Sequence, residues 1–305
     1  MKYAFFKGEI VPFEKATISI MTHAFNYGTG CFEGIRGYWN EDQRQMYILK
    51  LKEHYQRLVK SAEAIHINIG MNLKELCDIT VELVKRNGYR QDVYIRPLAY
   101  KSEEKIGLGL IGVADGFAIF LAPFGNYLDV SAGIKVCISK YRRISECSMP
   151  AGAKLTGAYF NSSLAKAEAL RRGFVEAITL SRKDNVAEGS GENIFMVKKG
   201  ELITPRLSDD ILPGITRRVV MRLAKDKLRI KTIEKSFKPK ELYAADELFF
   251  CGTGAQISPI VQVEKKKIGE GKVGPVTRRL QECYFKAVKG EDARYRGWLT
   301  AVNSA

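Results

Sequence analysis

One lysine of this sequence differs from the others in its neighbours. Lys154 lies in "SMPAGAKLTGAYFNSS" (148–163), a run of small residues directly before a predicted helix, whereas most other lysines stand in charged, solvated stretches. Partial desolvation disfavours the ammonium form of a lysine and makes its amine a nucleophile toward an aldehyde. A solvated loop lysine has a similar local sequence, so this prediction depends on what other segments supply.

Two turns have the composition of anion-binding sites. In "LPGITRR" (212–218), Pro213-Gly214 precedes a predicted amphipathic helix, and the free N–H groups and dipole at a helix start suit a phosphate. In "CGTGAQ" (251–256), small residues follow a predicted strand and leave backbone amides uncovered. Either segment by itself also fits an ordinary turn.

A glycine-rich turn supplies candidate acids. "AEGSGENIF" (187–195) lies between two predicted strands and carries Glu188 and Glu192, and either one fits a carboxylate that accepts a hydrogen bond from a protonated ring nitrogen. An amine, a phosphate site and such a carboxylate are the groups that pyridoxal phosphate requires of a protein. Together these segments indicate that cofactor.

Other apparent motifs predict no chemistry. "GLGLIG" (107–112) and "GEGKVG" (269–274) match the dinucleotide-binding spacing, but neither completes a βαβ unit, so we interpret both as loops. "GSGE" around Ser190 lacks the first glycine of a serine-hydrolase elbow, and no histidine follows it. The six cysteines contain no CxxC pair and the three histidines have no zinc-ligand spacing, which predicts reduced thiols and no metal.

Composition and charge indicate a globular protein. The 305 residues are 46% hydrophobic and 27% charged, which is ordinary for a chain of about two domains. "MKYAFFKGEIVPF" is too polar for a signal peptide and "FAIFLAPFG" is too short for a membrane span, so we expect a cytoplasmic protein with no membrane partner. The net charge of +15 permits nucleic-acid binding, but the basic residues are interleaved with acids, so we expect no nucleic-acid partner.

The hydrophobic periodicity predicts strands and helices in no regular order. Strands are expected at 3–13 (turning at Lys7-Gly8), 45–51, 93–100, 116–124, 133–139, 176–181, 193–205 (turning at Lys199-Gly200) and 246–253. Helices are expected at 52–67, 72–88 (N-capped by Asn72), 158–173, 216–228 and 275–290. Since no βα alternation or repeat emerges, we predict an α+β fold. The linker-like segment "FGNYLDVSAG" (124–133) predicts domains at 1–125 and 133–305, joined by 126–132.

Seven segments resemble, in this order, the class IV (fold-type IV) pyridoxal-phosphate aminotransferases, and most of all the branched-chain amino acid aminotransferases. They extend over nearly the whole chain and are "FNYGTGCFEGIRGY" (25–38), "EHYQRL" (53–58), "YIRPL" (94–98), "AGAKLTGAYFNSSLAKAEA" (151–169), "AEGSGENIF" (187–195), "LPGITR" (212–217) and "CGTGAQISPI" (251–260). The resemblance implies a small α/β N-terminal domain and a larger C-terminal domain with a pseudo-barrel sheet. It also implies ping-pong transfer of the amino group of L-leucine, L-isoleucine or L-valine to 2-oxoglutarate.

The resemblance assigns cofactor ligands by position in this sequence. Lys154 matches the lysine that forms the imine and carries the proton, Tyr159 matches the tyrosine at the phenolic oxygen, and Glu188 matches the acid at the ring nitrogen. The remaining ligands that it implies, mainly for the phosphate, are Arg57, Leu212, Ile215, Thr216 and Thr253.

The resemblance also assigns a substrate site and a partner. The N–H groups around Thr253-Gly254 resemble the site of the α-carboxylate, and Arg96 resembles the arginine that binds the γ-carboxylate of glutamate or 2-oxoglutarate. The walls of the apolar pocket are expected to be Phe32, Gly34, Tyr94, Tyr127 and Tyr159. In this family the loop around Leu108 reaches the site of a neighbouring subunit, which implies a homo-oligomer, a dimer or a hexamer, with shared active sites.

Three departures from the family pattern leave alternatives open. Gly254 replaces the more usual alanine, Phe124 stands where many relatives have tryptophan, and the loop "KSEEKIGLGLIG" (101–112) is longer by about one residue than in some relatives. A D-amino acid or (R)-amine aminotransferase and an aminodeoxychorismate lyase therefore remain alternatives. Arg96 within "YIRPL" argues against the D-amino acid enzyme and the lyase.

Overall fold

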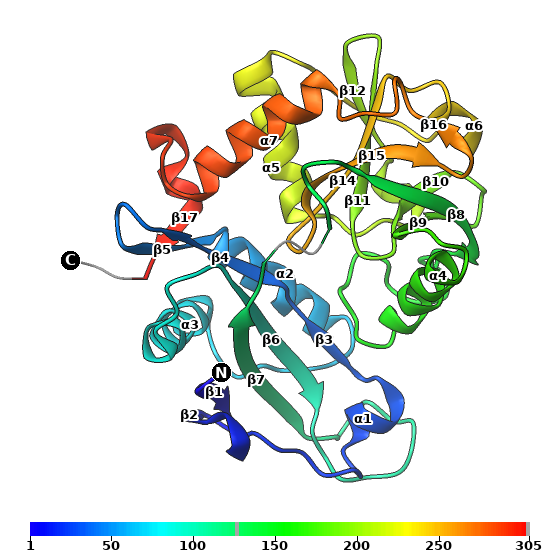
Figure 1. Ribbon diagram of the computed structural model, residues 1–305. Helices are drawn as coiled ribbons and strands as arrows, with labels where there is room; N and C mark the ends of the chain where they lie inside the picture. Colours follow the sequence, from blue (N-terminus) through cyan, green and yellow to red (C-terminus); the bar gives the residue numbers. More distant parts are fainter. Residues whose placement is uncertain (126–127, 303–305) are drawn as a thin grey trace. The chain divides into compact units, whose positions relative to one another are not determined.

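The computed structural model describes residues 1–125 and 128–302, which form two compact units (Figure 1). Of the described residues, the first unit takes 1–125, 153–157 and 286–302, and the second takes 128–152 and 158–285. The short segment around Lys154 therefore packs with the N-terminal part of the chain, although the residues on both sides of it belong to the second unit. The domain boundaries predicted at 125 and 133 stay a prediction.

The first unit is built on an antiparallel sheet with the strand order β17-β5-β4-β6-β7-β1-β2, and β3 also pairs with β6. Its strands are β1 (Tyr3–Phe6), β2 (Glu9–Pro12), β3 (Gly30–Phe32), β4 (Ile35–Asn40), β5 (Gln45–Leu49), β6 (Val93–Lys101), β7 (Asp115–Pro123) and β17 (Leu299–Ala301). Its helices are η1 (Phe13–Lys15), α1 (His23–Tyr27), α2 (Leu51–Glu63), α3 (Leu73–Asn87) and η4 (Ala293–Trp298). Helix α2 packs on α3 and β3, and α3 packs on β1.

Both hairpins predicted from Lys-Gly pairs are confirmed. Lys7 and Gly8 connect β1 to β2 with φ values of 50° and 90°. Lys199 and Gly200 connect β11 (Asn193–Lys198) to β12 (Glu201–Thr204) with φ values of 51° and 78°. A two-residue loop with positive φ at both positions matches the right-handed twist of the strands that it joins, and glycine adopts this conformation without strain.

A proline divides what would be one strand into β3 and β4. Both strands pair with β6 along the same edge, on either side of Glu33 and Gly34. Opposite this break, the N–H of Glu33 donates to the carbonyl of Pro97 over 3.0 Å. Because Pro97 has no N–H, it cannot donate the second hydrogen bond of this pair to the carbonyl of Glu33, and the ladder is interrupted at this point. A Cβ at Gly34 would lie 2.1 Å from the hydroxyl of Tyr94, so any larger residue here would force the Tyr94 side chain to move.

The two long helices of the first unit follow their sequence signals. Asn72 caps α3 by accepting from the N–H groups of Lys74 and Glu75, as predicted, and Gly88 ends it with a φ of 65°. The buried side of α2 is mostly apolar, but it also contains His54 and Ser61. Buried polar side chains require hydrogen-bond partners, so we expect His54 and Ser61 each to hold a specific neighbouring group in place.

The second unit is a barrel-like sheet with the order β10-β9-β8-β15-β14-β11-β12-β13, and β16 pairs with β15. Its other strands are β8 (Ile134–Arg142), β9 (Glu176–Leu180), β10 (Val186–Gly189), β13 (Thr232–Glu234), β14 (Glu247–Gly252), β15 (Gln256–Val263) and β16 (Lys266–Lys267). Since β10 also pairs with β11, the strands from β10 to β11 form a closed ring, which confirms the predicted pseudo-barrel. Its helices are α4 (Tyr159–Arg171), η2 (Leu207–Asp209), α5 (Ile215–Leu223), the π-helical turn η3 (Ala224–Leu228), α6 (Pro239–Leu242) and α7 (Pro275–Val288), whose last residues belong to the first unit.

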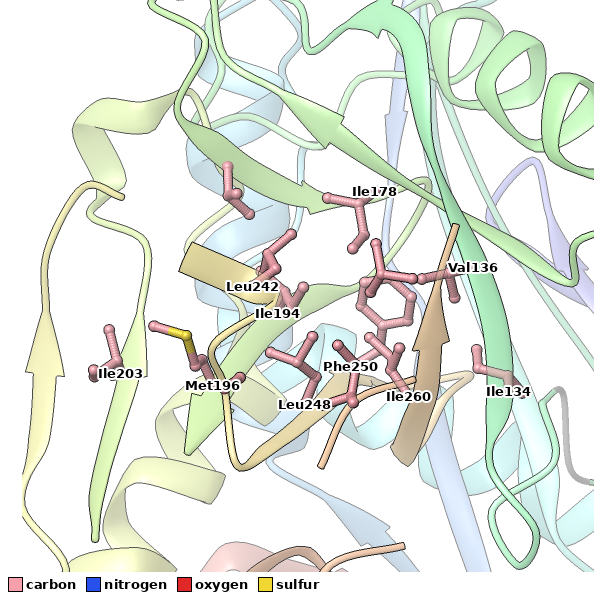
Figure 2. Close-up of a cluster of buried hydrophobic side chains, with 14 of the residues drawn as sticks. Ile134, Val136, Ile178, Ile194, Met196, Ile203, Leu242, Leu248, Phe250 and Ile260 are labelled. Atoms are coloured by element: carbon pink, nitrogen blue, oxygen red, sulfur yellow. The ribbon is translucent and has the colours of Figure 1, made fainter. Parts of the chain in front are cut away.

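The barrel is filled by aliphatic and aromatic side chains that converge from successive strands. Figure 2 shows Val136, Ile178, Ile194, Phe250 and Ile260 pointing toward one another from β8, β9, β11, β14 and β15. Each is at most 2% exposed. Burial of such a side chain contributes about 1.5–3 kcal/mol to folding, so this core holds the strand ends, where the candidate site lies, in fixed positions.

The expected elements appear with shifted ends, and a few were missed. The helix predicted at 216–228 ends as an α-helix at Leu223 and continues as the π-helical turn η3. Strands β4 and β15 were not predicted, because Gly37 and Pro259 interrupt the apolar pattern of these segments. In 1–125 and 128–302, no helix combines the length and the apolar character that a membrane crossing requires.

Candidate functional site

Glu188 lies on the barrel wall, where β10 meets β11. It belongs to the end of strand β10 rather than to the turn in which the sequence placed it. Its carboxylate is buried and accepts from Arg143 Nε over 2.7 Å, from Asn193 Nδ2 over 2.9 Å and from the backbone N–H of Leu212 over 3.1 Å. These donors favour the ionised form and hold the carboxylate in one orientation.

The second candidate acid, Glu192, has different surroundings. It is buried in the turn that follows β10 and accepts from the N–H of Gly191 over 3.1 Å. Burial, together with the nearby carboxylates of Glu176 and Glu188, raises the pKa of Glu192 to about 8. Glu192 is therefore protonated at neutral pH, which leaves Glu188 as the acid suited to a cationic ring nitrogen.

The turn before α5 is attached to the same carboxylate. Asn193 Nδ2, which contacts Glu188, also donates to the carbonyl of Leu212 over 3.0 Å. Gly214 is the N-cap of α5, so no side chain caps the start of this helix. A Cβ at Gly214 would lie 1.9 Å from Asn193 Oδ1. The glycine thus lets the turn approach Asn193 closely. The first N–H groups of α5, which begin at Ile215, have no partner within the helix and suit an anion.

Thr253 and Gly254 lie in the turn between β14 and β15, between the paired residues Gly252 and Gln256. A Cβ at Gly252 would lie 3.6 Å from the carbonyl oxygen of Gly191, so this turn adjoins the turn after β10. Three predicted segments of the second unit, 187–195, 212–216 and 251–256, therefore converge at one end of the barrel.

Tyr159 is the first residue of α4, which packs on β8 and β9. Its side chain is half-buried. The helix gives the tyrosine a fixed backbone position a few residues after Lys154 in the sequence. Its role at the phenolic oxygen of the cofactor remains a prediction.

Lys154 lies in the first unit and is fixed through its backbone. Its N–H donates to Ser61 Oγ over 3.0 Å, and its carbonyl accepts from the N–H of Phe32 over 3.1 Å. Ser61 Oγ in turn donates to the carbonyl of Arg57 over 2.9 Å. One hydroxyl therefore joins the backbone of the candidate amine to the backbone of a candidate phosphate ligand. The Nζ atom of Lys154 lies 5.0 Å from the centre of the Phe32 ring.

Arg57 is held by a buried acid that the sequence did not single out. Glu33 accepts from Arg57 Nε over 2.6 Å and from Arg57 Nη2 over 2.8 Å. His54 Nδ1 lies 2.7 Å from Glu33 Oε2. Arg57 and His54, which both belong to α2, thus contact the carboxylate of Glu33, the residue at the break between β3 and β4.

The candidate substrate residues of the first unit form an aromatic group around one cation. The guanidinium carbon of Arg96 lies 4.2 Å from the ring centre of Phe32 and 5.0 Å from that of Tyr94. Arg96 Nη2 donates to the hydroxyl of Tyr94 over 2.8 Å, and that hydroxyl lies against Gly34. An arginine between aromatic faces can bind a carboxylate while the rings contact an apolar side chain.

The remaining predicted residue, Tyr127, lies outside the described residues. Sequence reasoning missed the residues that orient the predicted ones, namely Glu33, His54, Ser61, Arg143 and Asn193. Asn193, Glu33 and His54 stand inside quoted motifs, and Ser61 follows Arg57 by one helical turn, so local signals for these four existed. Arg143 carries no such signal, because its contact with Glu188 depends on the pairing of distant strands.

The residues present fit pyridoxal phosphate. The second unit offers a buried carboxylate with oriented donors and a helix start whose glycine leaves room beside Asn193. The first unit offers a primary amine, at Lys154, and a guanidinium, at Arg57. An amine, a carboxylate and anion-binding N–H and guanidinium groups are the donor set that this cofactor requires.

Three comparisons with known proteins agree on one family. A family model described as amino-transferase class IV matches residues 30–263. A probable branched-chain-amino-acid aminotransferase of Aquifex aeolicus is 49% identical over 302 residues, which cover 99% of this chain and 97% of that protein. The crystal structure of a branched-chain aminotransferase from Thermoproteus uzoniensis with norvaline superposes with a TM-score of 0.95 at 42% identity and 99% coverage of both chains.

A further solved structure bears on the cofactor. The branched-chain amino acid aminotransferase of Thermobaculum terrenum in its PLP form is similar with a TM-score of 0.95 at 38% identity and 99% coverage of both chains. The D-amino acid, (R)-amine and lyase alternatives are not favoured, because the relatives named here are all branched-chain enzymes. This chain is a pyridoxal-phosphate-dependent transaminase that belongs to the class IV aminotransferases, among the branched-chain-amino-acid aminotransferases.

Proposed function

We propose that this protein transfers the amino group of L-leucine, L-isoleucine or L-valine to 2-oxoglutarate. The observation that carries the proposal is the 49% identity, over almost the full length of both chains, with a probable branched-chain-amino-acid aminotransferase. In the first half-reaction the amino acid leaves as its 2-keto acid. In the second, 2-oxoglutarate takes up the nitrogen and leaves as glutamate, so the enzyme returns to its starting state.

Pyridoxal phosphate, when bound, supplies an aldehyde that takes up the amino group and a ring that delocalises negative charge. Lys154 provides the amine that holds the cofactor covalently, and its Nζ moves the proton of the substrate carbon. Glu188 accepts a hydrogen bond from the ring nitrogen and keeps it protonated. The ion pair with Arg143, at 2.7 Å, supports this role, because it favours the charged carboxylate.

The cofactor's other groups are assigned to residues on fixed backbone positions. Tyr159, at the start of α4, donates to the phenolic oxygen. The phosphate ligands are Arg57, the turn and helix start at Leu212, Ile215 and Thr216, and the hydroxyl of Thr253. The dipole of α5 and the guanidinium of Arg57 both stabilise a dianion.

The substrate site accepts both an aliphatic and a carboxylate side chain. Phe32, Gly34, Tyr94 and Tyr159 contact the branched aliphatic chain. Arg96 binds the distal carboxylate of 2-oxoglutarate, and the N–H groups near Thr253-Gly254 bind the α-carboxylate. The position of the Arg96 guanidinium between the Phe32 and Tyr94 rings supports this dual use, because apolar and anionic groups find partners in one place.

We also propose a cytoplasmic homo-oligomer, a dimer or a hexamer. The support is a group of exposed apolar side chains in the first unit, which comprises Ile18, Ile20, Met21, Phe25, Ile106, Leu108 and Ile111. The segments that carry them lie side by side, since the N–H of His23 donates to the carbonyl of Glu103 over 2.9 Å and His23 Nε2 lies 2.8 Å from the carbonyl oxygen of Gly107. Exposed apolar surface of this kind marks an interface. Sedimentation of the wild type and of Leu108→Glu tests it, and a wild-type monomer would contradict it.

A panel of amino donors with 2-oxoglutarate as acceptor tests the activity. We expect L-leucine, L-isoleucine and L-valine to be the best donors, with D-alanine and (R)-1-phenylethylamine far slower. The purified protein should be yellow and change colour when L-glutamate is added. Comparable rates with a D-amino acid or an (R)-amine would contradict the assigned substrate class, and a colourless protein without transaminase activity would contradict the function itself.

A further inference from the structure

Glu33 links the break in the first sheet to the cation of Arg57. Its side chain is completely buried, and the missing N–H of Pro97 opposite Glu33 ends β3 at this position. Its two carboxylate oxygens accept from Nε and Nη2 of Arg57 over 2.6 Å and 2.8 Å. This two-point contact fixes the plane of the guanidinium, which a single hydrogen bond does not.

His54 holds the other side of the carboxylate. It is buried, and burial is the largest cause that lowers its pKa below the usual value, so the ring is neutral at neutral pH. A neutral ring beside a carboxylate carries its proton on Nδ1 and donates it to Glu33 Oε2, over 2.7 Å. Burial by itself raises the pKa of Glu33, but the opposing effects of Arg57 and His54 together lower it to about 2. The group therefore consists of one anion, one cation and one neutral donor.

This arrangement has a consequence for the side chain of Arg57. A guanidinium has five N–H donors in one plane, and Glu33 engages two of them on one edge. An unpaired arginine side chain samples many rotamers, and ordering it on binding costs free energy. A fixed counter-ion removes that cost before any anion binds. Ser61 joins the backbones of Arg57 and Lys154. The fixed guanidinium is therefore also held in position relative to the segment that carries Lys154.

We propose that Glu33, held by His54, is a positioning residue for Arg57 that pre-orients its guanidinium for the phosphate of the cofactor. This inference rests on the proposed function, in which Arg57 is a phosphate ligand. It adds a role to a fully buried residue that is not itself among the proposed ligands of the cofactor or the substrate. A purely structural Glu33 would stabilise the first unit without any preference for the phosphate group.

The experiment compares two ligands that differ only in the phosphate. The full-length protein is freed of cofactor and titrated with pyridoxal 5′-phosphate and with pyridoxal, and the dissociation constants are measured by absorbance. We expect Glu33→Gln to weaken binding of the phosphorylated ligand about tenfold or more, because the amide presents a donor to the donors of Arg57. Binding of pyridoxal should change by less than about twofold.

A second variant and a double variant separate positioning from folding. Glu33→Asp keeps the charge but shortens the side chain, so it should fold and still lose part of the preference for the phosphorylated ligand. Arg57→Ala should remove most of the preference, and adding Glu33→Gln to Arg57→Ala should weaken binding no further. Glu63→Gln, on the exposed side of the same helix, is the matched control and should bind both ligands like the wild type.

The outcomes distinguish this inference from the proposed function. If the wild type binds neither ligand, the proposed function fails and the inference fails with it. If Arg57→Ala removes the preference for the phosphorylated ligand while the folded Glu33 variants keep it, only the inference is overturned. Equal weakening of both ligands by a folded Glu33 variant would also overturn it, because that result indicates a general structural role.

Discussion

Asn193 and Glu188 face each other at the register position where β10 meets β11, and Asn193 Nδ2 donates to Glu188 Oε2 over 2.9 Å. The backbone pairing at this position closes the barrel, and the side-chain hydrogen bond orients a buried acid. Since Asn193 Nδ2 also reaches the carbonyl of Leu212, the start of α5 is positioned relative to that acid. The residue that pairs with Glu188 to close the barrel therefore also fixes the start of α5.

The role of Lys154 can be tested by removing its amine. Lys154→Ala should abolish transamination, because both the covalent attachment and the proton transfer depend on Nζ, while the fold should be retained because the backbone hydrogen bonds of residue 154 with Ser61 and Phe32 do not need its side chain. Borohydride reduction of the wild-type holoprotein followed by peptide mapping should label Lys154. Lys240→Ala, at an exposed lysine of the second unit, is the control. Label on a different residue would refute the assignment.

The charge of Glu188 can be tested with its closest neutral analogue. Glu188→Gln keeps the shape but loses the ion pair with Arg143, and the ring nitrogen then loses the partner of its proton. We expect kcat to fall by about a hundredfold to a thousandfold, that is about 3–4 kcal/mol in the barrier. Steady-state kinetics with saturating cofactor measures this loss. Glu201→Gln, exposed at the start of β12, should leave kcat unchanged. A fall of less than about threefold in the folded Glu188 variant would be incompatible with the proposed role.

Ser61 joins Arg57 and Lys154 through one hydroxyl, so its removal should lower both the catalytic rate and the stability. Ser61→Ala deletes the acceptor of the Lys154 N–H and the donor to the Arg57 carbonyl. We expect about a tenfold lower kcat together with a loss of about 1–2 kcal/mol in the free energy of unfolding. Kinetics and denaturant unfolding of the same samples measure both, with the exposed Ser208→Ala as control. An unchanged kcat in a folded variant would show that the link is dispensable.

Glu192 makes the stability depend on pH in the neutral range. Its folded-state pKa of about 8 lies above its ordinary value of 4.5, so between these values the folded state binds a proton that the unfolded state has released. Its contribution to stability is therefore complete below about pH 4.5 and is lost as the pH rises toward 8. Glu192→Gln removes the titration.

Unfolding by denaturant at pH 5.5 and pH 8 measures this effect. We expect the wild type to lose stability relative to Glu192→Gln as the pH rises, because the neutral amide still accepts from Gly191 N–H without becoming charged. Glu201→Gln should follow the wild type at both pH values. Parallel pH dependence in the wild type and Glu192→Gln would show that Glu192 is not protonated in the folded protein.

Local signals in the sequence determined the positions of the chemical groups. The Asn72 cap, the Lys-Gly hairpins and the Pro213-Gly214 turn before α5 each depend on a few adjacent residues, so their local conformations follow from residue type. The same holds for the candidate amine and acids, since the turns and strand ends that present them are short-range features. The resemblance in seven ordered segments then indicated the family.

Only the tertiary structure decided which groups support these residues. The segment of Lys154 packs with the first unit, Arg143 reaches Glu188 across the barrel wall, and Glu33 orients Arg57 where Pro97 breaks the ladder. Each of these contacts joins residues far apart in the chain. They depend on strand order, register and the burial of charge, and these are decided by the packing of the whole unit rather than by the composition of any one segment.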